Sequence, residues 1–236
     1  MHRFFAETID QTLTLSEADK HHALRVLRLK VGETIELVHD EVVTVMKIAS
    51  LQPFVIEPLE TKKESRELPF HLTLLYVVPK GDKWSFVLQK AVEMGVHEVI
   101  ALQSHYSVVR WREADMKQKQ DRHDAIIKEA SMQSKRLRLM TCERLYSFDK
   151  AIDLPFDVKF IASEHDLDTP VKASALQFQP GTRVALLIGS EGGFHPEEVV
   201  AAKAKGYQPL TLGPRILRTE TAVIVGLSYL TLGAHV

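Results

Sequence analysis

Residues 184–198 read VALLIGSEGGFHPEE, and this stretch decides the class of fold. The apolar run at its start predicts a buried strand. The glycine-rich turn that follows lets the backbone approach a ligand closely, and Pro196 is placed to open a helix as its first residue. A strand that passes through such a turn into a helix is typical of an α/β domain.

The same rhythm of strand and helix runs through the sequence after residue 69. Further strands are expected at 72–78, 97–102, 158–162 and 208–210, and helices near 82–94, within 114–134 and at 222–232. This alternation predicts a largely parallel sheet with helices on both faces. In such sheets ligands bind beyond the carboxyl ends of the strands, so the loops at that edge are the candidate site.

The first 60 residues have a different pattern, with short β-branched runs at 34–38, 42–46 and 54–56. One helix is expected before them, because Leu24, Leu27 and Val31 form an apolar stripe that Gly32 would end. The polar stretch TKKESRELP at 61–69 predicts a domain boundary. We therefore expect one domain over residues 1–68 and a second over 69–236.

Composition limits the functional classes. The chain has 236 residues, 45% of them hydrophobic, a net charge of −1 and a single cysteine. These values predict a cytoplasmic protein without disulfide, membrane span or metal site. Basic residues gather at 20–30 and again at Lys135, Arg136, Arg138 and Arg144. Each cluster is either a phosphate-binding patch or a solvated surface.

A second candidate loop is LGPRILRTETA at 212–222. It follows a short strand and leads into an apolar helix, which Thr219 is placed to cap and in whose first turn Glu220 would lie. Two arginines, Arg215 and Arg218, beside exposed-type aliphatic residues are unusual for a simple cap. This pattern favours a functional loop, whereas the glycine spacing at 189–193 does not fit a dinucleotide- or phosphate-binding fingerprint.

Together these segments resemble the bacterial 16S ribosomal RNA uridine-N3 methyltransferases of the SPOUT class, in which IGPEGGF and LGPRILRTETA are the typical C-terminal motifs. The match here is IGSEGGF at 188–194 and an intact 212–222. KGDK at 80–83 with QKAVEMGV at 89–96, and HHALRVLR at 21–28, resemble two further family segments. The sequence departs from the pattern at His105-Tyr106, where Glu-Arg is usual, and at Met132 and Lys135, which leaves the choice of target less defined than the cofactor.

The resemblance implies a small N-terminal PUA-like β-barrel that binds RNA and a C-terminal SPOUT domain with a trefoil knot. It also implies a homodimer that methylates N3 of a uridine in the decoding region of 16S rRNA, within the 30S subunit, using S-adenosylmethionine. Arg218, Arg215 and Glu220 are then the catalytic candidates. The implied cofactor residues are Ser163, Glu164, Leu187, Gly189, Glu191, Gly192, Gly193, Leu212, Ile216, Leu217, Arg218 and Thr219.

For RNA we expect contacts from Arg25, Arg28, Lys80, Lys83, Arg110 and Arg136. Three other functions stay open. The first is methylation of another rRNA or tRNA nucleotide. The second is a non-catalytic role as a ribosome assembly factor. The third is a nucleotide-dependent oxidoreductase that binds its nucleotide at the glycine turn. The carboxylate of Glu191, which would repel a pyrophosphate, disfavours the last of these.

Overall fold

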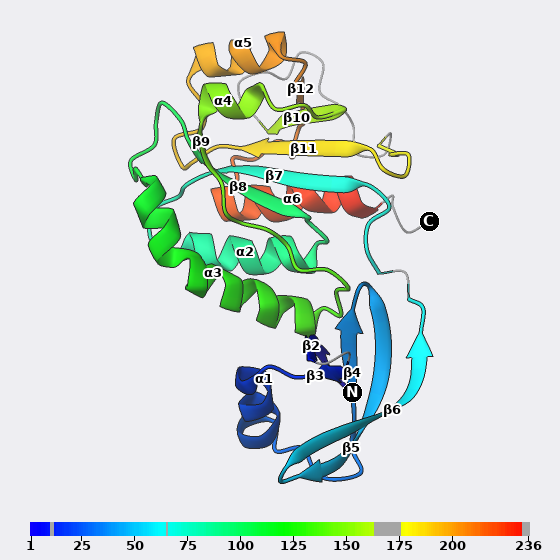
Figure 1. Cartoon of the computed structure of the whole chain (residues 1–236). Helices are drawn as coiled ribbons and strands as arrows, with labels where there is room; N and C mark the ends of the chain where they lie inside the picture. Colours follow the sequence, from blue (N-terminus) through cyan, green and yellow to red (C-terminus); the bar gives the residue numbers. More distant parts are fainter. Residues whose placement is uncertain (10–11, 65, 163–175, 233–236) are drawn as a thin grey trace. The chain divides into compact units, whose positions relative to one another are not determined.

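The structure, a computed structural model, describes residues 1–9, 12–64, 66–162 and 176–232 (Figure 1). The chain divides into two compact units. Unit 1 comprises Met1–Glu67 and Ser131–Leu139, and unit 2 comprises Leu68–Ala130 and Met140–Val236. The sequence predicts a boundary near this point but does not predict that residues 131–139 belong to the first unit.

Unit 1 is mostly β-structure. Its elements are β1 (His2–Phe5), β2 (Glu7–Ile9), β3 (Thr12–Thr14), α1 (Glu17–His21), the π-helical turn η1 (His22–Val26), β4 (Thr34–His39), β5 (Val42–Leu51) and β6 (Phe54–Lys62). Four strands form a sheet in the order β1-β4-β5-β6, in which β1 is parallel to β4 and the other pairs are antiparallel. Among the described residues this sheet has two edges and no closed barrel is found, so the PUA-like β-barrel that the resemblance implies is not confirmed.

The helix of unit 1 is shorter than predicted. It begins after Ser16, whose hydroxyl accepts the backbone N–H of Asp19 at 3.1 Å, and the helical residues end at Val26. Arg28 has a left-handed φ of 54°, which stops the helix before Gly32. Val31 is 58% exposed, so the predicted stripe is wrong at that position.

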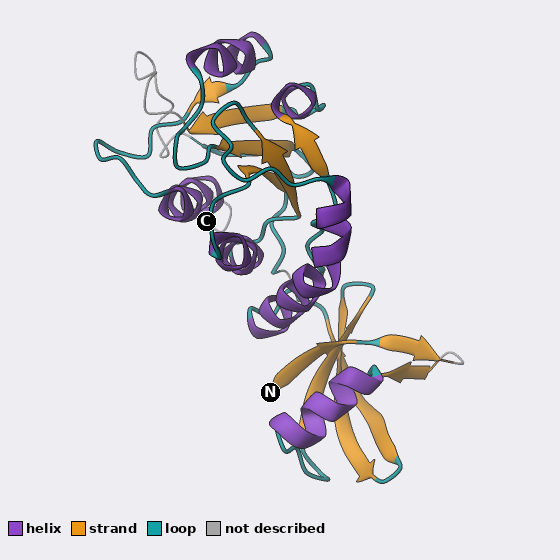
Figure 2. Cartoon of the chain, turned by 90° about the vertical axis from the view of Figure 1, so that its left-hand side faces the viewer, coloured by secondary structure: helices purple, strands orange, loops and turns teal. Residues whose placement is uncertain are grey.

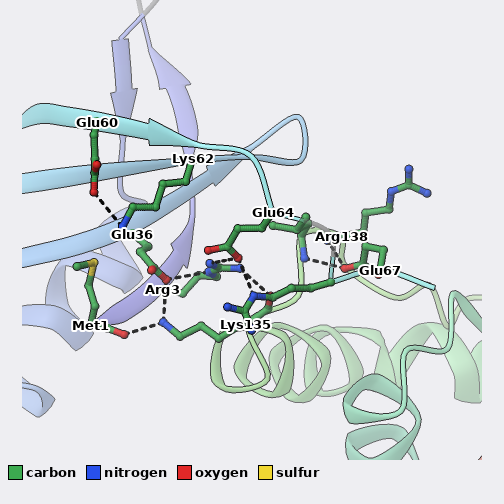
Figure 3. Close-up of polar contacts among 11 residues, drawn as sticks. Met1, Arg3, Glu36, Glu60, Lys62, Glu64, Glu67, Lys135 and Arg138 are labelled. Carbon is green, nitrogen blue, oxygen red and sulfur yellow. Dashed lines mark hydrogen bonds and ion pairs between the residues drawn. The ribbon is translucent and has the colours of Figure 1, made fainter. Parts of the chain in front are cut away.

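Residues 131–139 join unit 1 through a set of polar contacts around Glu67 (Figure 3). The Glu67 carboxylate accepts hydrogen bonds from the Arg136 guanidinium at 2.8 and 2.9 Å and from the backbone N–H of Leu137 at 2.7 Å. Leu137 also packs against Val38 and Val43. A buried ion pair and an apolar contact therefore both help to hold this segment in unit 1.

Unit 2 is an α/β domain. Its elements are β7 (His71–Val77), α2 (Lys83–Glu93), β8 (Glu98–Gln103), α3 (Glu113–Gln133), β9 (Leu145–Ser147), α4 (Phe148–Ile152), β10 (Val158–Ala162), β11 (Arg183–Ile188), α5 (Pro196–Ala204), β12 (Gln208–Pro209) and α6 (Thr219–Thr231). The strands form a sheet in the order β12-β10-β11-β7-β8-β9, and every pair is parallel. The parallel sheet predicted from the sequence is confirmed.

Helices cover both faces of this sheet, as Figures 1 and 2 show. On one face, α2, α3 and α6 pack against Leu72, Leu74 and Tyr76 of β7. On the other, α4 and α5 pack against Leu75 and Val77 of the same strand. Alternate residues of a strand point to opposite faces, and burial on both faces is why these strands read as continuous apolar runs.

Candidate functional site

A cavity of about 600 Å³ lies at the carboxyl ends of β10, β11 and β12 in unit 2. The loop after β11 and the loop between β12 and α6 form most of its wall. Its lining residues are Ala162, Ile188–Glu191, Gly193, Phe194, Leu210–Thr219 and Ala222. This is the edge of a parallel sheet at which ligands bind, and the volume suits a small molecule.

The loop after β11 is a tight turn built around glycines. Ser190 and Gly193 form a β-bridge, in which the Gly193 N–H donates to the Ser190 carbonyl at 3.0 Å. A Cβ at Gly189 would lie 3.1 Å from the Gly193 carbonyl carbon, closer than ordinary van der Waals contact. Only glycine at position 189 lets the two ends of the turn meet. Beyond the turn, Pro196 opens α5 as predicted, with His195 as its N-cap.

The second loop is tied to the first through Thr219. Its hydroxyl donates to the Gly189 carbonyl at 2.7 Å. The Tyr76 hydroxyl lies 3.3 Å from the Thr219 hydroxyl oxygen. The N-cap of α6 is Arg218, whose side chain makes no capping hydrogen bond. The predicted cap at Thr219 is therefore wrong. This residue is instead buried as the link between the two loops.

Lys83, at the start of α2, links the two loops a second time. Its ammonium lies 2.8 Å from a carboxylate oxygen of Glu191 and 3.3 Å from one of Glu220. Partial burial acts to raise the pKa of the Glu191 carboxyl, but its hydrogen bonds and the charge of Lys83 together outweigh burial, and the pKa lies below its usual value. The same contact raises the pKa of Lys83. Lys83 and Glu191 are therefore both ionised at neutral pH.

Several polar groups of the cavity have no protein partner. The Ser190 hydroxyl is buried without a hydrogen bond to any described residue. No described acceptor takes the backbone N–H of Leu212, Ile216 or Leu217. A buried polar group without a partner is costly, so the Ser190 hydroxyl suits a polar ligand. The three N–H groups lie on a more open loop, where Ile216 is 85% exposed, and are available to acceptors of the same ligand.

The remaining wall of the cavity combines apolar and cationic surface. Ile188, Leu212 and Leu217 offer aliphatic side chains. Arg215 and Arg218 are exposed at the wall and form no ion pair within the described part of the chain. A ligand with a flat apolar ring and hydrogen-bonding edges fits between the loops, and the arginines can hold an anion beside it.

Most residues predicted to bind a cofactor come together here. Those that line the cavity are Gly189, Glu191, Gly193, Leu212, Ile216, Leu217, Arg218 and Thr219, joined by the catalytic candidate Arg215. Leu187 does not line it, because strand alternation points its side chain to the opposite core. Gly192 faces Tyr106 instead. Glu220 is at the Lys83 ion pair, and Ser163 and Glu164 are outside the described residues.

Sequence reasoning missed two features of this site. Ser190 stands where the typical family motif has proline, and the sequence does not predict that this residue lines the cavity with its hydroxyl buried. Lys83 was expected to bind RNA, whereas it is engaged by Glu191 and Glu220. The KGDK motif is the one signal in the sequence for Lys83, and it does not predict the ion pairs with Glu191 and Glu220.

The basic residues expected to bind RNA have different surroundings. In the second cluster each cation has a glutamate partner: Lys135 pairs with Glu36, Arg136 with Glu67, Arg138 with Glu41 and Arg144 with Glu98. Arg136 is only 3% exposed, so its predicted role in RNA binding is corrected. By contrast, Lys80 and Arg110 are exposed, and exposed Arg25 and Arg28 line a separate hollow in unit 1.

Two further properties concern the described residues. None of their helices is both long enough and apolar enough to cross a membrane. They also contain no group of three or more His, Cys, Asp or Glu side chains arranged to hold a metal ion.

Comparison with known proteins points to one group. Residues 66–231 match the family model of the RNA methyltransferase domain. The chain is 30% identical to the ribosomal RNA small subunit methyltransferase E of Bacillus subtilis, over 97% of this chain and 95% of that protein.

Two solved structures are similar over nearly the whole chain. The first is a putative methyltransferase of Legionella pneumophila in complex with S-adenosylmethionine, 28% identical with a TM-score of 0.85, covering 98% of this chain and 96% of that one. The second is a ribosomal RNA small subunit methyltransferase E of Neisseria gonorrhoeae bound to S-adenosylmethionine, 28% identical with a TM-score of 0.81, covering 97% of this chain and 95% of that one.

Proposed function

The chain belongs to the RNA methyltransferase family that includes ribosomal RNA small subunit methyltransferase E, and from this we propose that it methylates N3 of a uridine in the decoding region of 16S rRNA with S-adenosylmethionine. The observation that carries the proposal is the cavity between the two loops. It offers apolar walls, unpartnered hydrogen-bond donors and two arginines without carboxylate partners in the described residues.

The donor set of the cavity fits S-adenosylmethionine. Leu212 and Leu217 would pack on the faces of the adenine, and the free backbone N–H groups of this loop would bond its ring nitrogens. The unpartnered Ser190 hydroxyl and Gly189 would hold the polar part, and Glu191 would offset the positive charge. When bound, this cofactor supplies an electrophilic methyl group on a sulfonium.

The chain's own residues would prepare the uracil. N3 carries a proton at neutral pH, so methylation needs a group that accepts this proton and a group that holds the resulting negative charge. We assign the charge to Arg218, with Arg215 as the alternative, and proton acceptance to Glu220 or Glu191. Lys83 pairs with both carboxylates. The electron pair freed on N3 would form the new bond to the methyl carbon, whose bond to sulfur would break and leave a neutral thioether.

RNA binding would involve both units. In unit 1, Arg25 and Arg28 beside an open hollow are our candidates for phosphate contacts. In unit 2, the exposed side chains of Lys80 and Arg110 serve the same purpose. Arg136 is left out because Glu67 already neutralises its charge in a buried pair.

Other features implied by the resemblance stand as proposals. We expect a homodimer, which light scattering coupled to size-exclusion chromatography would detect, and cytoplasmic localisation, which cell fractionation would test. The trefoil knot and the cofactor contacts of Ser163 and Glu164, two residues outside the described part of the chain, are further proposals, and an experimental structure with the cofactor bound would test both.

The deciding experiment is methyl transfer to small ribosomal subunits from a strain that lacks the protein, followed by nucleoside analysis. We expect 3-methyluridine at one position. Arg218→Ala should lower the rate at saturating cofactor on the order of 100- to 1,000-fold, a loss that calorimetry separates from any change in cofactor binding, and Arg218→Lys should retain part of the rate. Methylation of another nucleotide would support a different target, and neither binding nor transfer would support an assembly factor.

A further inference from the structure

Three aromatic side chains gather on the surface of unit 2, on two loops at the carboxyl edge of the sheet. The ring centroids of His105 and His195 are 4.5 Å apart, and Tyr106 lies 5.0 Å from His105 and 5.7 Å from His195. The Tyr106 side chain is 42% exposed. His105 is exposed as well, whereas His195 is half-buried, and the rings are tilted at 45–83° to one another. An exposed ring face in this cluster is a surface on which another flat ring can stack.

This ring cluster is held in place by one carboxylate. Glu198 accepts the backbone N–H of His105 at 2.8 Å on one oxygen and that of His195 at 2.9 Å on the other. A further hydrogen bond, from the Ser104 N–H to the Ser107 hydroxyl at 2.8 Å, closes the turn that carries Tyr106. The two loops are thus fixed relative to each other, so a ligand would find the rings already arranged and lose little affinity to ordering them.

The ring cluster adjoins the candidate active site. A Cβ built on Gly192 would lie 3.1 Å from the Cβ of Tyr106, and both neighbours of Gly192, namely Glu191 and Gly193, line the cavity. The backbone N–H of exposed Lys80 lies 3.3 Å from the Glu191 carboxylate. The ring cluster and the backbone of Lys80 therefore both contact the turn at 191–193 on the rim of the cavity.

We propose that His105, Tyr106 and His195 form a stacking platform for an unpaired base of the RNA next to the methylated nucleotide. This inference rests on the proposed function, because it takes the occupant of the neighbouring cavity edge to be RNA. Unpaired bases are recognised by stacking on aromatic side chains, and such stacking tolerates any base. Lys80 would contact the adjoining phosphate.

Substitution of Tyr106 by Leu or by Phe separates the effect of the aromatic ring on RNA binding from the effect of side-chain size. Both side chains keep the Cβ beside Gly192, but only Phe keeps an aromatic face. The probe is a single-stranded oligouridylate that carries one 2-aminopurine, whose fluorescence is quenched by stacking. With wild-type protein we expect binding and quenching. Tyr106→Leu should weaken the binding on the order of tenfold and abolish the quenching, whereas Tyr106→Phe should preserve both.

Each other outcome also has a meaning. Equal binding and quenching by wild type and Tyr106→Leu, no quenching by wild type, or equal losses in the Leu and Phe variants would each overturn the platform. Unchanged melting temperatures and unchanged calorimetric binding of S-adenosylmethionine would show that the variants are folded. If ring-dependent quenching is seen but small ribosomal subunits are not methylated, the proposed function fails and the platform stands.

Discussion

Replacing Gly189 by alanine tests whether the close approach of the two ends of the first loop creates the binding cavity. The added methyl would lie 3.1, 3.2 and 3.3 Å from three backbone atoms of Gly193. Because Gly193 is held by its hydrogen bond to Ser190, relief requires the backbone to shift. Overpacking of this kind costs about 1–3 kcal/mol.

The same energy sets the expected loss of affinity. If S-adenosylmethionine binds only the native spacing of the loop, it must restore that spacing, and its Kd should rise about fivefold to about 140-fold at 1.4 kcal/mol per factor of ten. Isothermal titration calorimetry measures the Kd, and urea unfolding measures the loss of stability.

Gly181→Ala is the matched control. Gly181 has a φ of +81° and no atom within 4 Å of a built Cβ, so alanine there is strained by about 1–3 kcal/mol but lies in the turn before β11, at the end of the strand away from the cavity. We expect comparable destabilisation by both variants and weaker cofactor binding only for Gly189→Ala. A wild-type Kd in a destabilised Gly189→Ala protein would refute the assignment of this loop to the cofactor.

Two further predictions concern contacts that hold each unit together. Glu67→Gln removes the negative charge that pairs with the buried Arg136 cation and should destabilise unit 1 by about 3–5 kcal/mol in urea unfolding, whereas Glu60→Gln, at an exposed pair, should change little. Burial acts to raise the pKa of Glu67, but its hydrogen bonds and the charge of Arg136 together outweigh burial, so the folded pKa lies below 4.5. The stabilisation is therefore present above pH 4.5 and is lost as the pH falls through the folded pKa. A wild-type protein that loses no more stability in acid than Glu67→Gln would contradict this. Thr219→Val leaves the Gly189 carbonyl unsatisfied and should cost about 1–3 kcal/mol and weaken cofactor binding by calorimetry, while Thr219→Ser should behave as wild type.

The strands and the position of the cavity follow from local patterns. The apolar run before Gly189 and the proline at 196 define β11, the turn and α5 without knowledge of any distant residue. The parallel arrangement then places the loops after the strands at one edge. For this reason the site could be located, and most of its lining named, from the sequence.

What could not be predicted depends on distant partners. Arg136 reads as a surface cation until Glu67, 69 residues away, is placed beside it. Lys83 reads as a phosphate ligand until Glu191, 108 residues away, accepts its hydrogen bond. Likewise, nothing in the sequence around Arg28 indicates a left-handed conformation, because that φ is uncommon for a non-glycine residue. Spacing along the chain does not encode these pairings.

The assignment of residues 131–139 to unit 1 bears on how the protein is made. During translation the amino-terminal part leaves the ribosome first, and domains generally fold as they emerge. Here the first 67 residues cannot complete their contacts until more than half of the polypeptide has been synthesised. Before that point the Glu67 carboxylate lacks Arg136, and Val38 and Val43 lack Leu137. By then β7, α2 and β8 of unit 2 have also been synthesised, so unit 1 can complete its folding only after part of unit 2 has been made.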